Sequence, residues 1–303
     1  MPIAIRQQIE ERADALGFPA LQRAATALSE AYRDGRPPKL PDAARTAAYL
    51  VTRMPATYAA ACAVLRESAP HLGAIASILD AGAGTGAASL AARVHFPAAA
   101  VTMIERDSAF TAAARQWLPD AVAIAADIAK LDTIPPHDLV IAAYSLGEFG
   151  GPLAARLWQA ARVALVLIEP GTPRGFALIR KVRASLLAAG ARMVAPCPAE
   201  SECPMVDPDW CHFAARVERS SLHRRVKGGE LGHEDEKFSY VALARQAVNL
   251  PAARIVRHPQ HRPGLIELQV CTPAGLRSDR ITKRDKDSFR AARKAAWGDA
   301  GIS

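Results

Sequence analysis

Short apolar runs alternate with helical stretches over the middle of the chain, residues 75–190. Strands that are buried on both faces of a parallel sheet read as continuous apolar runs, and the helices between them cover both faces. The pattern therefore predicts an α/β fold around a parallel sheet. The expected strands are 75–80, 101–106, 121–128, 138–149 and 164–171, and the expected helices are 87–94, 152–162 and 174–189.

Two helical stretches precede this part of the chain. Residues 3–34 carry apolar side chains at helical spacing, and residues 42–67 form a second stretch. The segment Gly-Arg-Pro-Pro-Lys-Leu-Pro at 35–41 separates them, because glycine and proline interrupt helices. We expect a helical cap in front of the main sheet.

Beyond residue 190 the periodicity weakens, and residues 191–235 are rich in cysteine, proline and charge. Residues 237–244 and 264–271 have the apolar pattern of strands that could close the sheet. The expected organisation is an N-terminal helical region (1–70), a Rossmann-like core (71–194), a cysteine-rich insertion (195–235), the closing strands of the core (236–276) and a basic tail (277–303).

A glycine loop follows the first expected strand, which ends at Asp80. Gly82, Gly84 and Gly86 precede the helix that starts at 87. Glycines at such a turn let a ligand approach the backbone, and a helix N-terminus favours anionic or polar groups. The loop from Asp80 to Gly86, including Ala83, is therefore a candidate nucleotide-binding loop.

Two acidic residues lie at the ends of the second and third expected strands, where their carboxylates could bind a nucleoside. Glu105 ends the second expected strand, nineteen residues after Gly86, and its carboxylate could accept both ribose hydroxyls. Asp127 ends the third and could accept the adenine amino group. The spacing Gly-x-Gly-x-Gly favours S-adenosylmethionine, whereas dinucleotide enzymes more often show Gly-x-Gly-x-x-Gly. A nicotinamide oxidoreductase with a structural zinc site, or a glycine turn without a ligand, stays open as an alternative.

The segment after the fourth strand, 143–149, occupies the usual place of a methyl acceptor site. It lacks the Asn/Asp-Pro-Pro-Tyr/Phe sequence of many amino-group methyltransferases and contains no cysteine. Tyr144 and Glu148 are its polar groups, and they could equally only line the cofactor pocket. No catalytic residue is predicted.

Four of the five cysteines form a candidate metal site. Cys197, Cys203 and Cys211 are spaced Cys-x5-Cys-x7-Cys, Cys271 follows after a long gap, and Cys62 lies in the second helical stretch as an expected core thiol. Four thiolates suit zinc or an iron–sulfur cluster. The short hooks of zinc fingers are absent, and the wide spacing fits a cubane cluster better. Unconnected buried cysteines remain the alternative, and His212 is a possible substitute ligand.

The chain carries 38 Lys and Arg against 30 Asp and Glu, a formal net charge of +8. Such a balance favours a polyanionic partner such as RNA, although a solvated basic surface would have the same composition. Two basic segments, 216–227 and 277–297, are candidate RNA contacts. The named candidates are Arg216, Arg219, Arg224, Arg225, Lys227, Lys283 and Arg284.

Four segments give the sequence a resemblance to a known family. They are 197–213, which contains Cys-Pro, Cys-Pro-Met and Asp-Trp-Cys-His-Phe, the segment 234–241, Tyr-Ser-Leu-Gly-Glu-Phe at 144–149, and Ile-Glu-Pro-Gly-Thr-Pro-Arg-Gly-Phe at 168–176. Together they resemble the methyltransferase-like proteins of the small ribosomal subunit, which include bacterial members and mitochondrial assembly factors. Between Cys197 and Cys203, Ala-Glu-Ser-Glu replaces an expected histidine without removing a ligand.

The resemblance implies a Rossmann-like class I methyltransferase fold, small-subunit ribosomal RNA as partner and a role in ribosome assembly, with or without RNA methylation. It implies a [4Fe–4S] cluster on Cys197, Cys203, Cys211 and Cys271, with zinc as the alternative metal. The family's S-adenosylmethionine loop falls on Asp80 to Gly86. With the residues identified by position, the predicted cofactor site comprises Asp80, Gly82, Ala83, Gly84, Gly86, Glu105, Asp127 and Tyr144.

No apolar run is long enough for a membrane-spanning helix, and the first residues have neither the apolar core of a secretory signal nor the composition of a transit peptide. We therefore expect a cytoplasmic protein without membrane or DNA partners.

Overall fold

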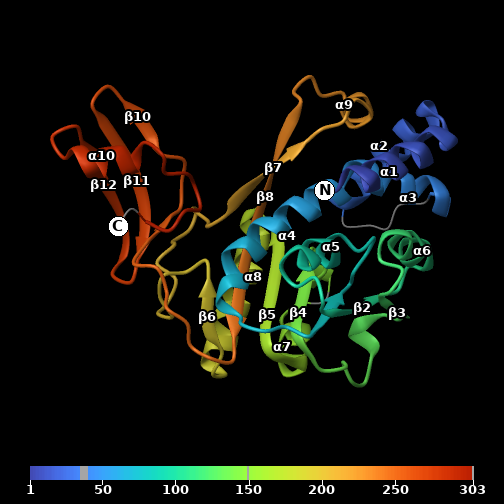
Figure 1. Cartoon of the computed structure of the whole chain (residues 1–303), viewed down its shortest axis with the longest axis horizontal. Helices are drawn as coiled ribbons and strands as arrows, with labels where there is room; N and C mark the ends of the chain where they lie inside the picture. The colour runs from blue at the N-terminus through green and yellow to red at the C-terminus, as the bar shows by residue number, and fades with distance from the viewer. Residues whose placement is uncertain (35–39, 149, 302–303) are drawn as a thin grey trace.

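The computed structural model describes residues 1–34, 40–148 and 150–301. Over these residues the chain forms an eight-stranded mixed sheet and, at the C-terminal end, a separate four-stranded antiparallel sheet (Figure 1). Helices cover both faces of the larger sheet, and the N-terminal helices lie over one end of it.

The larger sheet has the strand order β3-β2-β1-β4-β5-β8-β6, and β7 pairs with β8 alone. The first five strands are parallel, while β8 runs antiparallel to β5 and to β6. The strands are β1 (Ser77–Ala81), β2 (Ala100–Glu105), β3 (Val122–Ala125), β4 (His137–Ala143), β5 (Ala161–Pro170), β6 (Arg192–Ala195), β7 (Phe213–Glu218) and β8 (His233–Ala244).

This order identifies the fold. A dinucleotide-binding sheet has the parallel order 3-2-1-4-5-6, whereas here an antiparallel strand stands between β5 and β6. The chain therefore has the Rossmann-like class I methyltransferase fold, as predicted from the alternation of strands and helices and from the resemblance.

The central strands are apolar on both faces, because both are covered. Ile78 faces one core with α4 and α5, and its neighbour Leu79 faces the other with α7 and α8. Burying each such side chain contributes about 1.5–3 kcal/mol. The helices of these layers are α4 (Met54–Ser68), α5 (Ala87–His95), α6 (Ser108–Trp117), α7 (Gly151–Ala160) and α8 (Pro173–Ala188), with short 3-10 turns η1 (Ala69–His71), η2 (Ile128–Lys130) and η3 (Leu146–Glu148).

The N-terminal helical cap is present, but each predicted helix is divided in two. Gly17, at a φ of 81°, separates α1 (Ile3–Leu16) from α2 (Phe18–Asp34). Arg53 separates α3 (Asp42–Thr52) from α4. These breaks let the cap fold back on itself around one apolar cluster, and α3 lies against α6.

The C-terminal part departs from the prediction. The strand expected over 264–271 is β11 (Leu265–Thr272), and it belongs to the smaller sheet instead of closing the larger one. The predicted basic tail begins inside β12 (Gly275–Thr282) and continues into α10 (Lys286–Ala292), which packs on that sheet. Alternating apolar residues let β11 bury one face against α10, a pattern that periodicity alone cannot assign to one sheet or another. The remaining elements are β9 (Arg254–Ile255), β10 (Gln260–Arg262) and α9 (Ser221–Lys227).

Candidate functional site

The glycine loop connects β1 to α5 at the carboxyl edge of the sheet. Gly82, Gly84 and Gly86 all have positive φ, at 73°, 54° and 79°. Such backbone is strained for residues with a Cβ. A Cβ on Gly82 would also lie 2.6 Å from the Cβ of Ser145, which follows β4. The backbone of the loop at Gly82 therefore packs directly against the Ser145 side chain, with no room for a side chain at position 82.

Glu105 ties the end of β2 to this loop. Its Oε2 accepts a hydrogen bond from the Gly84 backbone N–H at 2.8 Å, and its Oε1 accepts one from the Asp107 N–H at 2.8 Å. Each carboxylate oxygen can accept a further hydrogen bond. Glu105 is thus held beside the loop with acceptor capacity left, as its predicted role requires.

Asp80 differs from its predicted role as a cofactor ligand. Its side chain is 1% exposed, and its Oδ2 accepts hydrogen bonds from both the N–H and the hydroxyl of Ser89. Burial raises the pKa of Asp80 to about 6, although the Ser89 hydrogen bonds oppose the shift. The carboxylate therefore lies beneath the loop and anchors α5, which makes it a support of the site.

Asp127 lies after β3, as predicted, and its Oδ1 caps η2 by accepting from the Ala129 N–H at 3.1 Å. The other oxygen lies 3.7 Å from the Lys130 ammonium. The side chain is partly exposed at the same edge of the sheet as Glu105, because β3 neighbours β2. It can still accept a hydrogen bond from a ligand.

Tyr144 lies directly after β4 with a φ of 58°, the one described residue other than glycine with positive φ. Its hydroxyl donates a 3.0 Å hydrogen bond to Glu236 on β8. Below it, buried Glu169 accepts hydrogen bonds from the backbone N–H groups of Leu146 and Gly147. Strained backbone of this kind marks functional segments. The side chain of Glu148 lies outside the described part of the chain.

Sequence reasoning missed several polar groups around this edge. Glu169 lies near the end of the expected strand 164–171, and Glu236 directly precedes the expected strand 237–244; these positions could have marked them. Tyr49 and Arg53 come from the N-terminal helices, and nothing in their local sequence singles them out. Only the folding of α3 over the sheet brings Tyr49 beside the glycine loop and Arg53 near Glu236.

The four predicted ligand cysteines line a single cavity beside α8. Three come from the segment between β6 and β7, and Cys271 comes from β11 of the smaller sheet. Two buried arginines hold this segment: Arg183 donates to the carbonyls of Ala199 and Ser201, both at 2.8 Å, and Arg254 donates to that of Pro196. The residues that line the cavity therefore come from both the larger and the smaller sheet.

All four of these thiols are free. Burial and the neighbouring sulfurs raise the pKa of Cys211 well above the ordinary value and that of Cys271 to about 11, and burial raises the pKa of Cys197. Within the described ranges no three Cys, His, Asp or Glu side chains converge as ligands of one metal ion. Metal binding by this set therefore stays a prediction.

His212 does not line the cavity; it stacks on Trp210 at 5.2 Å and meets the edge of Trp297 at 4.8 Å. It therefore takes part in an aromatic cluster, and its predicted role as a substitute ligand finds no support in this position.

The basic residues predicted on 216–227 are engaged within the protein. Arg216 pairs with Asp235 at 3.0 Å, while Arg219 and Lys227 both pair with Glu234. Burial alone would raise the pKa of Glu234, but hydrogen bonds from His223, Lys227 and Arg219 lower it well below the ordinary value. Arg225 lies over the Phe18 ring at 4.4 Å, and Arg224 contacts Ser221 at 3.4 Å.

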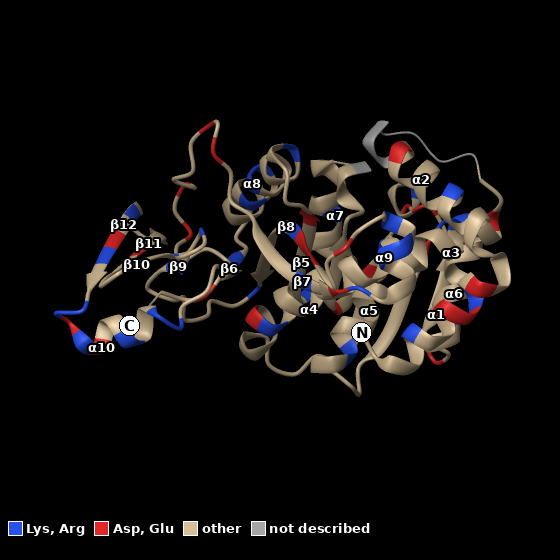
Figure 2. Cartoon of the chain, turned by 90° about the horizontal axis from the view of Figure 1, so that it is seen from above, with Lys and Arg blue, Asp and Glu red and all other residues tan. Residues whose placement is uncertain are grey.

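The C-terminal part is different. Residues 254–301 carry eleven Lys and Arg against five Asp and Glu, so they hold most of the excess positive charge of the chain. Figure 2 shows basic residues on β12 and α10. Lys283 and Arg284 are exposed between these two elements, and neither pairs with a carboxylate among the described residues.

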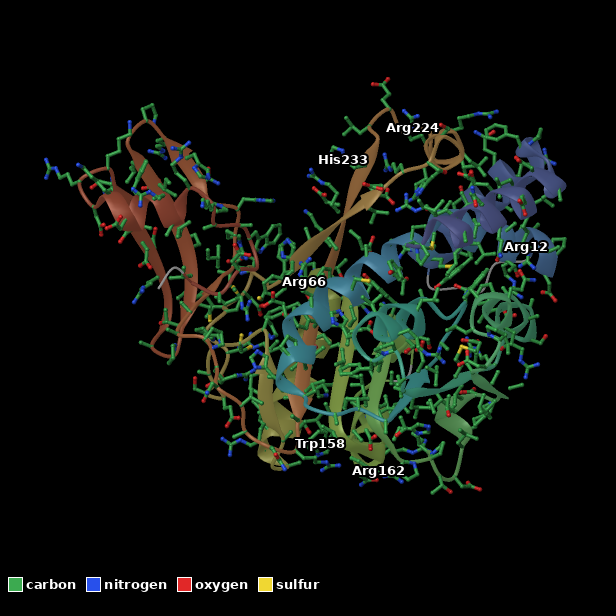
Figure 3. All side chains as sticks on the ribbon, in the orientation of Figure 1. Arg12, Arg66, Trp158, Arg162, Arg224 and His233 are labelled. Atoms are coloured by element: carbon green, nitrogen blue, oxygen red, sulfur yellow. The ribbon has the colours of Figure 1, made fainter. Side chains whose placement is uncertain are left out.

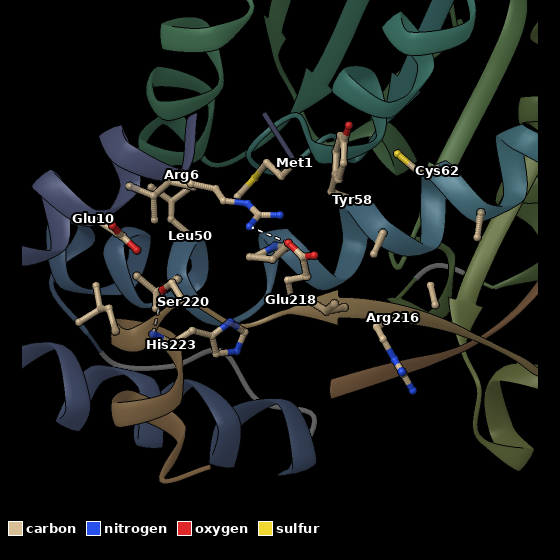
Figure 4. A pocket seen from close by; sticks show the side chains of 18 of the residues that line it. Met1, Arg6, Glu10, Leu50, Tyr58, Cys62, Arg216, Glu218, Ser220 and His223 are labelled. Carbon is tan, nitrogen blue, oxygen red and sulfur yellow. Dashed lines mark hydrogen bonds and ion pairs between the residues drawn. The ribbon is translucent and has the colours of Figure 1, made fainter. Parts of the chain in front are cut away.

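A further cavity, of about 670 Å³, lies between α1, α4, β7 and α9 (Figure 4). Arg6 reaches across it to Glu218 at 3.2 Å. Cys62 lines this cavity and not the one that contains the other four cysteines. The structure therefore separates Cys62 from the candidate metal site, in agreement with the sequence prediction.

No helix among the described residues is long and apolar enough to cross a membrane.

The sequence of residues 43–301 matches the family described as "Mitochondrial small ribosomal subunit Rsm22". Among curated proteins, Rsm22-cox11 tandem proteins 1 and 2, both mitochondrial proteins of Schizosaccharomyces pombe, are 30% identical to the chain over 179 residues. That alignment covers 45% of this chain and 24% of each relative.

Solved structures with related folds include a TehB-like SAM-dependent methyltransferase from Corynebacterium glutamicum, with 17% identity, a TM-score of 0.41 and coverage of 62% of this chain and 88% of that one. Another is the plantazolicin methyltransferase BpumL with bound SAH, with 15% identity, a TM-score of 0.42 and coverage of 79% and 100%. Both scores are low, and the strand order of the chain itself defines its fold.

Proposed function

Because the chain belongs to the Rsm22 family of mitochondrial small ribosomal subunit proteins, we propose that it binds S-adenosylmethionine and a [4Fe–4S] cluster, associates with small-subunit ribosomal RNA and acts in assembly of that subunit. One observation carries the proposal beyond the family. The glycine loop, Glu105 and the segment after β4 meet at the carboxyl edge of a sheet with methyltransferase strand order.

Each residue of the predicted cofactor site would bind a different part of the cofactor. Gly82, Ala83, Gly84 and Gly86 let the ligand approach the backbone, Glu105 accepts hydrogen bonds from the ribose, and Asp127 accepts one from the adenine amino group. Tyr144, directly after β4, would line the cofactor pocket. The cofactor, when bound, supplies a methyl group on a sulfonium. The antiparallel β8 disfavours the nicotinamide alternative, since dinucleotide sheets lack such a strand.

A Glu105→Ala variant tests the cofactor site. We expect about a 100-fold loss of affinity for S-adenosylhomocysteine in calorimetric titration, because hydrogen bonds to a charged acceptor are worth about 1.5–3 kcal/mol each. The ligand should also lose its stabilising effect on thermal unfolding. Unchanged affinity would contradict the assigned site. Loss of RNA methylation in this variant with ribosome binding retained would support an enzyme; wild-type protein that binds without methylating would support an assembly factor.

The cluster proposal rests on the donor set. Four free thiols lie around one cavity, in a loop held by buried arginines. Cys197, Cys203, Cys211 and Cys271 would hold the cluster and would leave no iron open. Since burial raises the pKa of three of these thiols, loading must displace protons. The cluster, when bound, supplies a cross-link between the two sheets or a redox centre.

The exposed charge supports RNA contact through the C-terminal sheet and α10, with Lys283 and Arg284 as phosphate ligands. The residues on 216–227 fit this role less well, because most of their charge is neutralised within the protein.

Salt-dependent binding to a small-subunit ribosomal RNA transcript distinguishes the two basic segments. For the K283A/R284A double variant we expect weaker binding and a slope of log affinity against log salt reduced by about two, since each phosphate contact contributes about one. Arg216→Ala is the matched control and should leave the slope nearly unchanged. If Arg216→Ala reduces the slope and the K283A/R284A double variant does not, the RNA-binding surface lies on β7 and β8 instead.

A further inference from the structure

The strand β7 forms a free edge of the larger sheet, because it pairs with β8 and with no other strand among the described residues. Its consecutive residues Ala214–Glu218 all line the cavity of about 670 Å³ between α1, α4, β7 and α9 (Figure 4). Consecutive side chains of a strand point to opposite faces of its sheet. Since residues of both faces line the cavity, the free edge of β7 borders it.

The register of the β7–β8 pair shows which backbone groups lie at this edge. The Arg219 N–H donates to the Gly232 carbonyl at 2.8 Å, one position beyond the last residue pair of the ladder. In an antiparallel pair, opposite residues alternate between those that bond each other and those whose N–H and C=O groups point away. The backbone groups of Ala214, Arg216 and Glu218 therefore point away from β8 toward the cavity. No described residue forms a hydrogen bond with them.

The cavity also carries opposite charges at its two ends. Glu10 of α1 lies at one end and Cys62 of α4 at the other (Figure 4), and Arg66 follows Cys62 by one helical turn (Figure 3). Neither Glu10 nor Arg66 forms an ion pair with a described residue. Between these ends, Ala59 and Ala63 give α4 a wall of small apolar side chains.

The chemistry of this edge favours a polypeptide as its ligand. An extended segment can add to a row of unpaired N–H and C=O groups as a further strand, whereas a nucleic acid has no matching repeat of backbone donors and acceptors. The strand β7 runs from Arg216, at the Cys62 end, to Glu218, nearer Glu10 (Figure 4). An antiparallel segment would therefore place its first residue beside Glu10 and its last beside Arg66.

We propose that the cavity beside β7 binds an extended segment of a partner protein, which adds to β7 as an antiparallel strand. The two charged ends select a segment with a basic residue first and an acidic residue last, and the alanines of α4 select small or medium apolar side chains between them. This inference does not depend on the proposed cofactor, cluster or RNA, so it can fail without affecting them.

A fluorescein-labelled peptide, Lys-Val-Thr-Val-Thr-Val-Glu with blocked ends, is the probe, titrated with the full chain and followed by fluorescence polarisation. Two further peptides carry N-methyl groups, one on the valines and one on the residues after them. One of these two should bind about 10- to 100-fold more weakly than the parent and the other within about threefold, because only alternate N–H groups face β7 and each hydrogen bond contributes about 0.5–1.5 kcal/mol.

Arg216→Pro and Arg216→Ala are the matched variants of the protein. Proline removes the N–H at the centre of the free edge, while the hydrogen bonds to β8 belong to the neighbouring residues. We expect Arg216→Pro to lower the affinity for the peptide about tenfold or more, and Arg216→Ala to leave it within about twofold. Arg66→Gln should lower the affinity about 2- to 5-fold, and this effect should vanish for a peptide that ends in glutamine.

Several results would overturn the inference. They are absence of peptide binding up to about 1 mM, equal losses for the two N-methylated peptides, and equal affinities of folded Arg216→Pro and Arg216→Ala. If Arg216→Pro unfolds, the N-methylated peptides on the wild type decide. Binding of a short oligouridylate but not of the peptide, weakened by Arg66→Gln, would assign the cavity to RNA. A dimer in sedimentation that Arg216→Pro abolishes and Arg216→Ala retains would assign the edge to a second copy of the chain.

Discussion

Replacing any one of Cys197, Cys203, Cys211 or Cys271 by serine is expected to remove nearly all iron and acid-labile sulfide from anaerobically purified protein. The wild type should contain about four of each per chain, the content of one cubane cluster with four thiolate ligands. Serine keeps the size of the side chain but is a poor ligand for iron. Metal analysis and the visible absorption spectrum measure the result.

Cys62→Ser is the matched control, because Cys62 lines a different cavity in contact with the N-terminal helices. It should retain the full content of iron and sulfide. The four ligand variants should also unfold at lower temperature, since the free energy of metal binding contributes to that of folding. One zinc per chain without sulfide would contradict the cluster and leave a structural zinc site.

The second large effect is expected from Gly82→Ala. The added Cβ would stand 2.6 Å from the Cβ of Ser145, and the φ of 73° is strained for alanine. We expect a destabilisation of about 2–4 kcal/mol from strain and overpacking together. Thermal unfolding should shift down by about 3–6 °C, and the affinity for S-adenosylhomocysteine should fall because the loop must move.

Two further variants separate the causes. Gly73 has a similar φ of 68° but nothing within 4 Å of an added Cβ, so Gly73→Ala should cost about 1 kcal/mol from backbone strain alone. Adding Ser145→Gly to Gly82→Ala removes the clash, and the double variant should lose less stability than the two single changes predict. If the losses of stability of the two single variants simply add in the double variant, steric contact with Ser145 does not cause the destabilisation by Gly82→Ala.

The cofactor loop could be predicted from sequence because its parts are local. A strand, a glycine turn and a helix follow one another within about twenty residues, and Glu105 ends the next strand. Parallel strands place their carboxyl ends at one edge, so spacing along the chain translates directly into proximity. The exception is Asp80, whose burial beneath the loop depends on the packing of α5.

The cysteine set shows where local pattern becomes insufficient. Spacing related Cys197, Cys203 and Cys211 to one another, whereas Cys271 follows after a long gap and its inclusion depended mainly on the family resemblance. In the structure Cys271 belongs to β11, in a sheet that the sequence analysis had merged with the larger one. The alternation of apolar and polar residues in β11 predicts a strand but not which strand it pairs with, because long-range packing determines the pairing.

The amino-acid sequence by itself determined the alternation of strands and helices, the glycine loop with Glu105, and the concentration of cysteine and of basic charge. These features depend on residue type and short spacing. Tertiary structure decided that Cys271 lines one cavity with the other three cysteines, that Arg216, Arg219 and Lys227 pair with carboxylates, and that Tyr49 lies beside the glycine loop. Each of these depends on contacts between segments distant in the chain, which arise when apolar faces pack and which no local pattern specifies.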